Sequence, residues 1–224
     1  MHAKAASNRN RQTDDARARL MQAGLRLFAQ LGFRQTSTRE LAEAAQVNVA
    51  AISYYFGDKA GLYRAVFFEP FGSVERDLAR FSSPTLPLAE ALHGYFAAFL
   101  EPLRQGDDAR QCIKLHFREM LEPTGLWEEQ LSHDIEPLHH ALLALLCRHL
   151  GLDQADDHLE RLAVCLSGLG VHLHVGRDCT DRVAPRLNQD AAAIERWSDS
   201  LVLFGLAMVQ AEAARRQLMS HEAP

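Results

Sequence analysis

The segment 36–56 constrains the fold of this chain more than any other part. Ser37 followed three residues later by Glu40 is a capping box, in which each side chain satisfies a backbone amide at the start of a helix. This helix can run only to about Ala45, because the next three residues look like a turn that ends on Asn48, a good helix cap. A second short helix is therefore expected in the rest of the segment.

The flanking residues predict a longer helix before this pair and another helix after it. Apolar residues at three- and four-residue steps predict a helix over 13–31, which Gly32 ends in the left-handed conformation that glycine adopts easily. Asp58 can cap a helix that starts near Lys59. A long helix followed by two short helices and a tight turn is typical of a helix-turn-helix DNA-binding head. A generic small helical bundle is the alternative.

The charge is distributed unevenly along the chain. The net charge is −5, yet residues 1–64 hold ten basic and five acidic side chains, which gives this part +5 and the remainder −10. A basic head on an acidic body indicates a polyanionic partner for one end. Residues 1–12 lack apolar periodicity and are expected to form a disordered basic arm. Arg9 and Arg11 could enter a minor groove, the alternative being a solvated arm.

The rest of the chain is predicted to be helical as well. Pro70 and Pro137 lie inside two of the predicted helices and should mark kinks or helix starts. The fold class is all-α, with an arm over 1–12, a three-helix head over 13–60 and a helical ligand-binding and dimerisation domain over 61–224. The further helices are expected at roughly 59–81, 87–104, 108–121, 125–150, 155–176 and 190–218.

Several classes of protein are disfavoured by the sequence. No apolar run reaches the length of a membrane span, and the polar N-terminal residues lack the apolar core of a signal peptide, so a cytoplasmic protein without membrane contact is expected. The four cysteines form no C-x-x-C pair, which disfavours a disulfide framework. No catalytic triad, H-E-x-x-H sequence or phosphate-binding glycine loop occurs, so neither an enzyme nor a cofactor is expected.

Residues 16–62 contain Gly32-Phe33, the run 36–42 and the run 47–56 in a fixed order and spacing. With this pattern the segment resembles the head of the TetR family of bacterial transcriptional regulators. Gln46, Ala51 and Ser53 depart from the usual Gly, Thr and Tyr, which leaves the operator sequence open. A later run, Arg118-Glu119-Met120-x-Glu122-Pro123, is similar to the CecR-like (YbiH-like) branch, which controls drug or toxin efflux genes. The matching residues in the head are Ala23, Leu27, Phe28, Gly32, Phe33, the run 36–42, the run 47–56, Lys59 and Leu62.

The position of the second short helix and the resemblance together imply how the head binds double-stranded operator DNA. Val49, Ala50 and Ala51 would meet base edges, where they can contact only thymine methyl groups. Arg39 is the best candidate for a strong base contact; a phosphate contact or an ion pair with Glu43 is the alternative. The complete predicted set is Ser37, Thr38, Arg39, Asn48, Val49, Ala50, Ala51, Ser53, Tyr54, Tyr55 and Lys59.

Most of the polar members of this set are expected to hold phosphates and so fix the register of the head on the duplex. Tyr55 has a second interpretation, as a core residue behind the recognition helix. These phosphate contacts are expected from Ser37, Thr38, Tyr54, Tyr55 and Lys59.

A single short recognition helix reads few base pairs, so a homodimer is expected. The apolar stripes of the last two helices are the predicted dimer faces, and the resemblance implies that they form a four-helix bundle with their copies. Packing of both stripes inside one subunit is the alternative. The stripes are represented by Leu162, Leu166, Leu169, Trp197, Leu201 and Phe204.

The middle helices are then expected to surround an apolar site for an unidentified small-molecule effector, although the same residues could be plain core. The resemblance implies a repressor whose ligand shifts the helix starting at Lys59 and releases the operator, plausibly that of an efflux or detoxification operon. The predicted ligand-binding residues are Phe96, Phe99, His116, Phe117, Met120, Trp127 and His172.

Eleven histidines invite a metal-sensing regulator as the alternative function. Cys112 and His116 share one helical face, but no third ligand can be named from the sequence. His139 and His140 are adjacent and point in different directions on a helix. No metal site is therefore predicted, and an enzyme is the remote alternative.

Overall fold

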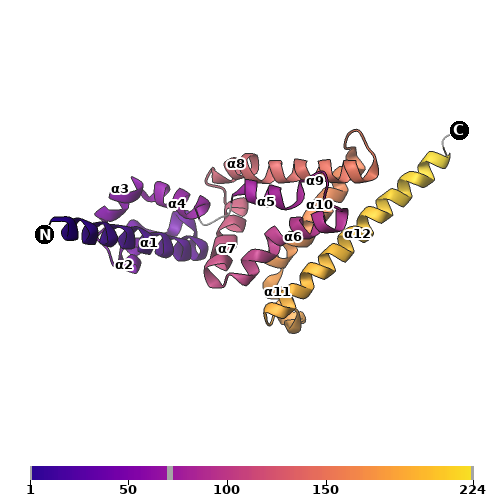
Figure 1. Cartoon of the computed structure of the whole chain (residues 1–224). Helices are drawn as coiled ribbons and strands as arrows, with labels where there is room; N and C mark the ends of the chain where they lie inside the picture. The colour runs from indigo at the N-terminus through magenta and orange to yellow at the C-terminus, as the bar shows by residue number, and fades with distance from the viewer. Residues whose placement is uncertain (1, 70–72, 223–224) are drawn as a thin grey trace. The chain divides into compact units, whose positions relative to one another are not determined.

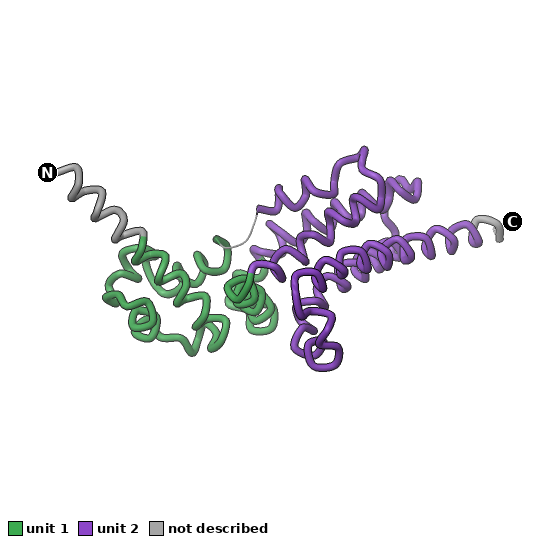
Figure 2. The backbone as a smooth tube through the Cα atoms, turned by 60° about the horizontal axis from the view of Figure 1, so that its bottom comes forward, with its two compact units in different colours: residues 1–72, 106–128 green, residues 73–105, 129–224 purple. Residues whose placement is uncertain are grey.

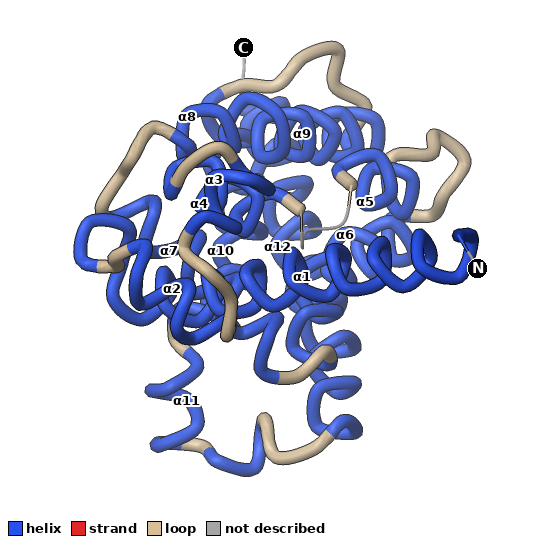
Figure 3. The backbone as a smooth tube through the Cα atoms, turned by 90° about the vertical axis from the view of Figure 1, so that its left-hand side faces the viewer, coloured by secondary structure: helices blue, strands red, loops and turns tan. Residues whose placement is uncertain are grey.

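The computed structural model describes the backbone of residues 2–69 and 73–222 and the side chains of residues 15–69 and 73–219. Throughout these ranges the regular elements are helices, and none of the described residues belongs to a strand (Figure 1, Figure 3). The predicted all-α fold class is confirmed. The chain divides into two compact units: unit 1 comprises residues 1–72 and 106–128, and unit 2 comprises residues 73–105 and 129–224 (Figure 2).

Unit 1 combines four consecutive helices with a fifth from much later in the chain. Its core is mostly aliphatic with a few aromatic rings, and Leu115 of the fifth helix is fully buried in it, as are Phe28 and Phe67. The helices are α1 (His2–Gln35), α2 (Thr38–Ala45), α3 (Ala50–Phe56), α4 (Lys59–Phe68) and α7 (Asp107–Leu121).

The first helix starts earlier than predicted and is broken at Gly32, the residue predicted to end it. Helix α1 extends from His2 to Gln35, and Gly32 interrupts it with φ 82° and ψ 167°, a conformation available essentially to glycine alone. The positive φ expected at Gly32 is therefore confirmed. The side chains of residues 1–14 lie outside the described part of the chain. They include those of Arg9 and Arg11, for which minor-groove contacts were predicted.

Unit 2 is built on a leucine-rich core. Leu92, Leu146 and Leu166, from three different helices, are all fully buried in it. The helices are α5 (Val74–Phe81), α6 (Leu88–Arg104), α9 (Glu136–Leu150), α10 (Asp157–Val175), α11 (Arg177–Val183) and α12 (Ala191–Glu222).

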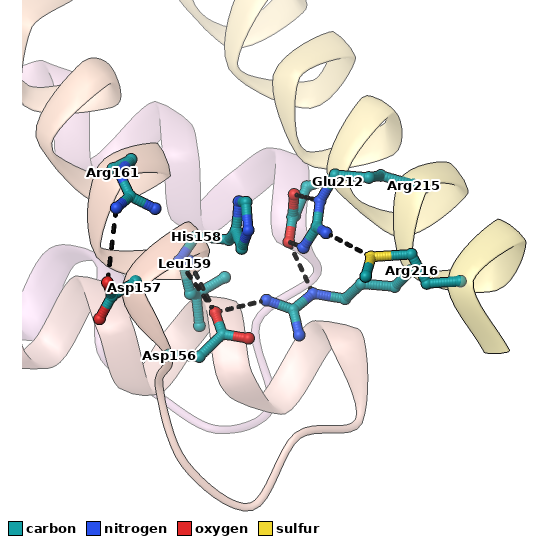
Figure 4. Close-up of polar contacts among 9 residues, drawn as sticks. Asp156, Asp157, His158, Leu159, Arg161, Glu212, Arg215 and Arg216 are labelled. Atoms are coloured by element: carbon teal, nitrogen blue, oxygen red, sulfur yellow. Dashed lines mark hydrogen bonds and ion pairs between the residues drawn. The ribbon is translucent and has the colours of Figure 1, made fainter. Parts of the chain in front are cut away.

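An ion-pair network joins the start of α10 to the C-terminal part of α12 in unit 2 (Figure 4). The Asp156 carboxylate caps α10 by accepting hydrogen bonds from the amides of His158 (3.1 Å) and Leu159 (3.0 Å). Arg216 lies 2.8 Å from Asp156 and 2.7 Å from Glu212. The hydrogen bond from Arg216 holds the pKa of Asp156 well below its ordinary value.

Two of the predicted segments are wrong. The run 59–81 is two helices, because α4 ends at Phe68 and Ser73 caps α5 by accepting a hydrogen bond from the amide of Arg76 (3.3 Å). Pro70 itself lies outside the described residues. The loop expected at 176–188 contains α11 and a 3₁₀ turn, Pro185–Leu187.

The predicted helix over 125–150 is interrupted near Pro137, as expected. It consists of α8 (Leu126–Gln130), a π-helical segment (Leu131–Ile135) and α9, with Pro137 in the first turn of α9. Proline lacks an amide hydrogen and its ring crowds the carbonyl one turn earlier, so the backbone widens into the π segment just before it.

Unit 1 contains helices α4 and α7, which the sequence analysis assigned to the domain 61–224. The role of that domain in ligand binding and dimerisation stays a prediction. The four cysteines are all free. None of the helices in the described parts of the chain is both long and apolar enough to span a membrane.

Candidate nucleic-acid interface

The start of α2 is held by the predicted capping box. The amide of Glu40 donates to the Ser37 hydroxyl (3.2 Å), and the amide of Ser37 donates to the Glu40 carboxylate (2.8 Å). These hydrogen bonds from Ser37 hold the pKa of Glu40 below its ordinary value. Ser37 and Thr38 are both exposed, so the first turn of α2 presents its amides and hydroxyls to solvent.

The turn between α2 and α3 depends on a strained residue. Gln46 has φ 54° and ψ 46°, and it is the non-glycine residue with positive φ in the described part of the chain. The turn is closed by hydrogen bonds from the amide of Gln46 to the carbonyl of Glu43 (3.1 Å) and from the amide of Val47 to the carbonyl of Ala42 (3.0 Å). Gln46 therefore performs the backbone role of the glycine expected there.

The N-terminal part of α3 is exposed, as a recognition helix requires. Asn48 accepts a hydrogen bond from the amide of Ala50 (2.9 Å), so it caps the helix as predicted. Val49 is 45% exposed, and Ala50 and Ser53 are also exposed. Ile52 is buried and anchors the helix from behind. Ala51 is half-buried.

The two tyrosines of α3 differ in their surroundings. Tyr54 is 76% exposed, whereas Tyr55 is half-buried and packs against the core of unit 1. Their rings meet edge to face, with centroids 4.8 Å apart. Tyr54 is therefore free to reach a phosphate, while the packing of Tyr55 corresponds to its second interpretation, as a core residue behind the helix.

Arg39 and Lys59 have intramolecular partners in the free protein. The Arg39 guanidinium is exposed and its Nε lies 3.1 Å from the Glu43 carboxylate. The Lys59 ammonium donates to the carbonyl oxygens of Phe33 and Thr36, both at 2.9 Å, and lies 4.3 Å from the centroid of the Phe33 ring. Lys59 thus ties the start of α4 to the loop that follows α1.

A buried carboxylate that the sequence analysis did not assign connects α4 to α7. Glu119 is fully buried and accepts a hydrogen bond from the Tyr63 hydroxyl at 2.7 Å. It also accepts hydrogen bonds from the Thr124 amide (2.7 Å), the Thr124 hydroxyl (3.0 Å) and the Leu126 amide (3.2 Å). Burial, followed by the bond to Glu119, raises the pKa of Tyr63 well above its ordinary value. Glu119 belongs to the run that starts at Arg118, which the sequence marked as similar to one branch of the family. The sequence did not indicate that Tyr63 would be its hydrogen-bond partner.

Arg118, the neighbour of Glu119, joins α7 to the end of α1. Its Nη1 donates to the carbonyl oxygens of Gln30 (3.0 Å) and Ala29 (3.5 Å). A Cβ at position 32 would lie 2.8 Å from the Arg118 Nε, so Gly32 is needed for space as well as for its backbone conformation. Helix α7 is therefore bound to both α1 and α4.

The predicted ligand-binding residues fall on both units. His116 is buried in unit 1, where its ring stacks on Phe67 at 4.0 Å and burial lowers its pKa to about 4. In unit 2, Phe96 is fully buried, Phe99 packs on Gly170 and His172 is exposed. In unit 1, Phe117 and Trp127 are half-buried and Met120 is 42% exposed.

The predicted dimerisation residues are mostly used inside unit 2. Leu162, Leu166 and Leu201 are buried in its core, and Leu169 and Trp197 pack against that core. Phe204 remains 48% exposed. This burial corresponds to the alternative in which both stripes pack within one subunit. A different row of α10 is exposed and apolar: Val164 (61%), Val171 (36%) and Val175 (60%).

Among the described residues, no group of three or more His, Cys, Asp and Glu side chains is arranged to hold a metal ion. His139 instead lies 2.8 Å from Glu160, and His116 has its Nδ1 2.8 Å from the carbonyl oxygen of Cys112.

Family profiles match both halves of the chain. Residues 20–66 match the profile described as bacterial regulatory proteins of the tetR family, and residues 88–209 match the C-terminal domain of the HTH-type transcriptional dual regulator CecR. The curated relatives are likewise transcriptional regulators. The HTH-type transcriptional dual regulator CecR of Shigella flexneri is 31% identical over 176 residues, which cover 74% of this chain and 78% of the relative.

Three further proteins are similar to this chain. The HTH-type transcriptional regulator RutR of Escherichia coli K12 is 31% identical over 143 residues, 64% of this chain and 66% of that protein. The solved structure of HlyIIR, a hemolysin II transcriptional regulator, covers 85% of this chain and 98% of its own with a TM-score of 0.57 at 18% identity. NalD of Pseudomonas aeruginosa, described as the secondary repressor of the MexAB-OprM multidrug efflux pump, has a TM-score of 0.55 at 16% identity and covers 86% of this chain and 97% of its own.

The solved structures support the fold, and the sequence relatives and profiles support the family. The chain therefore belongs to the TetR family of bacterial transcriptional regulators, with a helix-turn-helix DNA-binding domain at its N-terminal end and a C-terminal domain of the CecR type.

Proposed function

We propose that this protein is a ligand-responsive repressor that binds operator DNA as a homodimer in the bacterial cytoplasm and releases it when a small molecule binds the C-terminal domain. The observation that carries the proposal is the exposed, doubly capped start of α2 and α3 in a chain of this family. Amides and hydroxyls at helix starts suit phosphate oxygens, and a short exposed helix suits the major groove.

Arg39 is proposed to make the strongest base contact. Its side chain is 85% exposed, and an i,i+4 ion pair at that exposure is weak enough to give way to a guanine edge. Arg39→Ala should weaken operator binding by about 1–3 kcal/mol and relax specificity at one base pair, measured by competition mobility shifts on single-base operator variants. Arg26→Ala, at an exposed arginine of α1, is the control. An equal loss on every operator variant would contradict the base contact.

Lys59 is proposed to contact a phosphate in addition to its two carbonyl partners. An ammonium has three donors, and two of them are used by Phe33 and Thr36. Lys59→Ala should flatten the dependence of operator affinity on salt by about one phosphate contact. An unchanged salt slope together with a lower unfolding free energy would leave Lys59 with a structural role alone.

The dimer is proposed to form through the exposed row Val164, Val171 and Val175 of α10. Gly168 lies in the same row, with open space where its Cβ would be, so a second helix can approach closely. Val171→Glu should shift the protein toward monomer in analytical ultracentrifugation, whereas His172→Glu, which adds the same charge at the next, exposed position, should not. Equal behaviour of the two variants would exclude this face.

The effector is proposed to bind in unit 2, and an apolar groove there supports this part of the function. The groove has a volume of about 830 Å³ and lies between α6 and α12, where small residues such as Ala89 and Ala97 face Val202, Leu203 and Leu206. Apolar concavities of about 300–1,000 Å³ are typical of small-molecule sites. The residues predicted from the sequence to bind the effector do not line this groove, and they remain a second set of candidates.

Control of an efflux or detoxification operon is the final part of the proposal. The relatives named above include a repressor of a multidrug efflux pump. A mobility shift on the DNA upstream of this protein's own gene and its neighbours, with and without candidate drugs, tests it. If the protein binds this DNA but no candidate drug releases it, a drug-responsive repressor is contradicted. The proposal that the protein binds operator DNA would still stand.

A further inference from the structure

A cavity in unit 1 lies outside the DNA-contacting surface and outside the groove of unit 2. Its volume is about 350 Å³, the lower end of the range of about 300–1,000 Å³ found for small-molecule sites. It is formed where the end of α1, the middle of α4 and the end of α7 meet. The lining residues are Phe33, Arg34, Tyr63, Arg118, Glu122, Pro123 and Thr124.

One arginine in the wall of the cavity, Arg118, is held in place before any ligand arrives. Arg118 is held by the carbonyl oxygens of Gln30 and Ala29, and its guanidinium occupies the space left by the missing side chain of Gly32. Side chains that are already ordered lose little further entropy on binding, so a site lined by them is preorganised.

The polar and aromatic parts of the wall are fixed as well. The Tyr63 ring packs edge to face on Phe28, with centroids 4.9 Å apart, and lies 5.0 Å from the Phe33 ring. Glu119 behind the wall accepts hydrogen bonds from both Tyr63 and Thr124. The cavity therefore offers rigid aromatic surface beside rigid polar groups.

The charge balance in the cavity favours an anion. The Arg34 side chain is exposed and makes no ion pair with any described residue, and the Nη2 of Arg118 makes no hydrogen bond within the described structure. The only carboxylate lining the cavity is Glu122, which is 66% exposed and reaches the Arg118 Nε at 3.4 Å, a long contact. The Glu119 carboxylate keeps its negative charge behind the wall, but it does not line the cavity, and four neutral donors already occupy its oxygens.

We propose that this cavity is a second ligand site, inside the DNA-binding unit, for a small aromatic carboxylate. The carboxylate lies between Arg118 and Arg34, where it displaces Glu122, and the ring lies against Phe33. Arginine binds planar carboxylates well because its donors form a matching fork. Such a ligand would contact α1, α4 and α7 together, so it would stabilise one arrangement of the head.

The test uses the full-length protein and two probes that share a ring system but differ in charge. Isothermal titration with 1-naphthoate and with 1-naphthylmethylammonium compares them directly, without DNA. Binding of 1-naphthoate at least about tenfold tighter than the ammonium is expected, since only the anion can pair with the guanidinium groups. Absence of 1-naphthoate binding, or equal binding of the two probes, would overturn the proposal.

Two substitutions with opposite expected signs test the site itself. Arg34→Gln should weaken 1-naphthoate binding about tenfold, because a charge-assisted hydrogen bond is lost. Glu122→Gln should strengthen it about threefold, because the competing carboxylate is removed. Arg26→Gln removes the same charge from an exposed site on α1 outside the cavity. It should change neither the affinity for 1-naphthoate nor that for 1-naphthylmethylammonium. Thermal unfolding checks that each variant folds.

Equal affinities for Arg34→Gln and Arg26→Gln would overturn the assignment of the site to this cavity. Ala97→Leu fills the groove of unit 2 and should leave 1-naphthoate binding unchanged, while loss of binding in that variant would place the probe in the groove instead. Because no DNA enters these titrations, their failure leaves the proposed repressor function untouched.

Discussion

The two units of this protein are stabilised in different ways. Unit 1 contains short helices, of 8, 7 and 10 residues for α2, α3 and α4, and polar side chains hold their ends and enter the core. In unit 2, α6, α10 and α12 have 17, 19 and 32 residues and pack through leucines, with charged groups at the helix ends. Helices as short as those of the head are unstable alone, so their caps and tertiary hydrogen bonds decide their stability.

The comparison teaches where each unit is sensitive. Each of the helices α2, α3 and α4 is too short to compensate by its own apolar packing for a lost polar contact, and a buried partner left unpaired adds its own cost. In unit 2 the same kind of substitution at an exposed helix end removes little, because the leucine core remains. The following predictions test this contrast, from the largest expected effect to the smallest.

Glu119→Ala should destabilise unit 1 by about 3–5 kcal/mol, because the Tyr63 hydroxyl and two backbone amides lose their buried acceptor. Urea unfolding followed by circular dichroism measures the loss. Glu122→Ala, three residues away and 66% exposed, is the matched control and should change stability by about 0.5 kcal/mol or less. If the two variants unfold at the same urea concentration, the buried carboxylate does not stabilise the head.

Acidification should destabilise both units through one histidine in each, buried His116 in unit 1 and half-buried His174 in unit 2. Burial lowers the pKa of His116 in unit 1 and of His174 in unit 2 to about 4, from an ordinary value of 6.5. Between these values the unfolded chain binds the proton and the folded chain does not, so the unfolding free energy falls as pH falls from about 6.5 to 4. Each group accounts for roughly 3 kcal/mol of this fall.

His116→Phe keeps a ring against Phe67 but cannot bind a proton. Urea unfolding at a series of pH values should therefore show a shallower fall for this variant than for the parent protein. The expected control is His93→Phe, since His93 is exposed on α6. A fall in His116→Phe as steep as in the parent would show that this imidazole is not the group that resists protonation.

Arg216→Leu should reduce the stability of unit 2 by less than Glu119→Ala reduces that of unit 1. The Asp156 side chain is 49% exposed, so water and salt screen its attraction to Arg216. Glu212 is only 10% exposed, but without Arg216 it still pairs with Arg215 at 2.8 Å. Thermal unfolding at low and high salt measures the effect, and the difference between variant and parent should shrink at high salt. A loss as large as that of Glu119→Ala, independent of salt, would contradict the contrast between the units.

Gln46→Gly should stabilise the head by about 1 kcal/mol or less, because glycine adopts the positive φ of this turn without strain. Ala44→Gly places the same residue two positions earlier, inside α2, where it should destabilise by about 1 kcal/mol. Thermal unfolding should therefore move in opposite directions for the two variants. A shift in the same direction would mean that Gln46 is not strained.

The sequence by itself determined the elements of the head because their signals are local. The capping box from Ser37 to Glu40 and the cap at Asp58 each act within three residues, and the structure has both. The same local reasoning placed Asn48 before the recognition helix. It also identified the family, through residues whose order and spacing are visible along the chain.

The sequence also predicted most helices of unit 2, but it did not predict which of their apolar faces are buried. Its periodicity revealed apolar stripes on α10 and α12, yet α10 has apolar residues on two sides, and only folding shows that Leu162 and Leu166 are buried while Val164 and Val171 are exposed. Periodicity reports that a helix has an apolar face; it does not report which neighbour covers that face.

Only the tertiary structure decided the contacts between distant residues. Glu119 meets Tyr63, 56 positions earlier, Arg118 binds carbonyls at the end of α1, and Lys59 binds carbonyls that no sequence pattern marks. The insertion of α7 into the unit that binds DNA is of the same kind. A hydrogen bond between residues far apart in the chain depends on the packing of whole helices, so it leaves no local signal in the sequence.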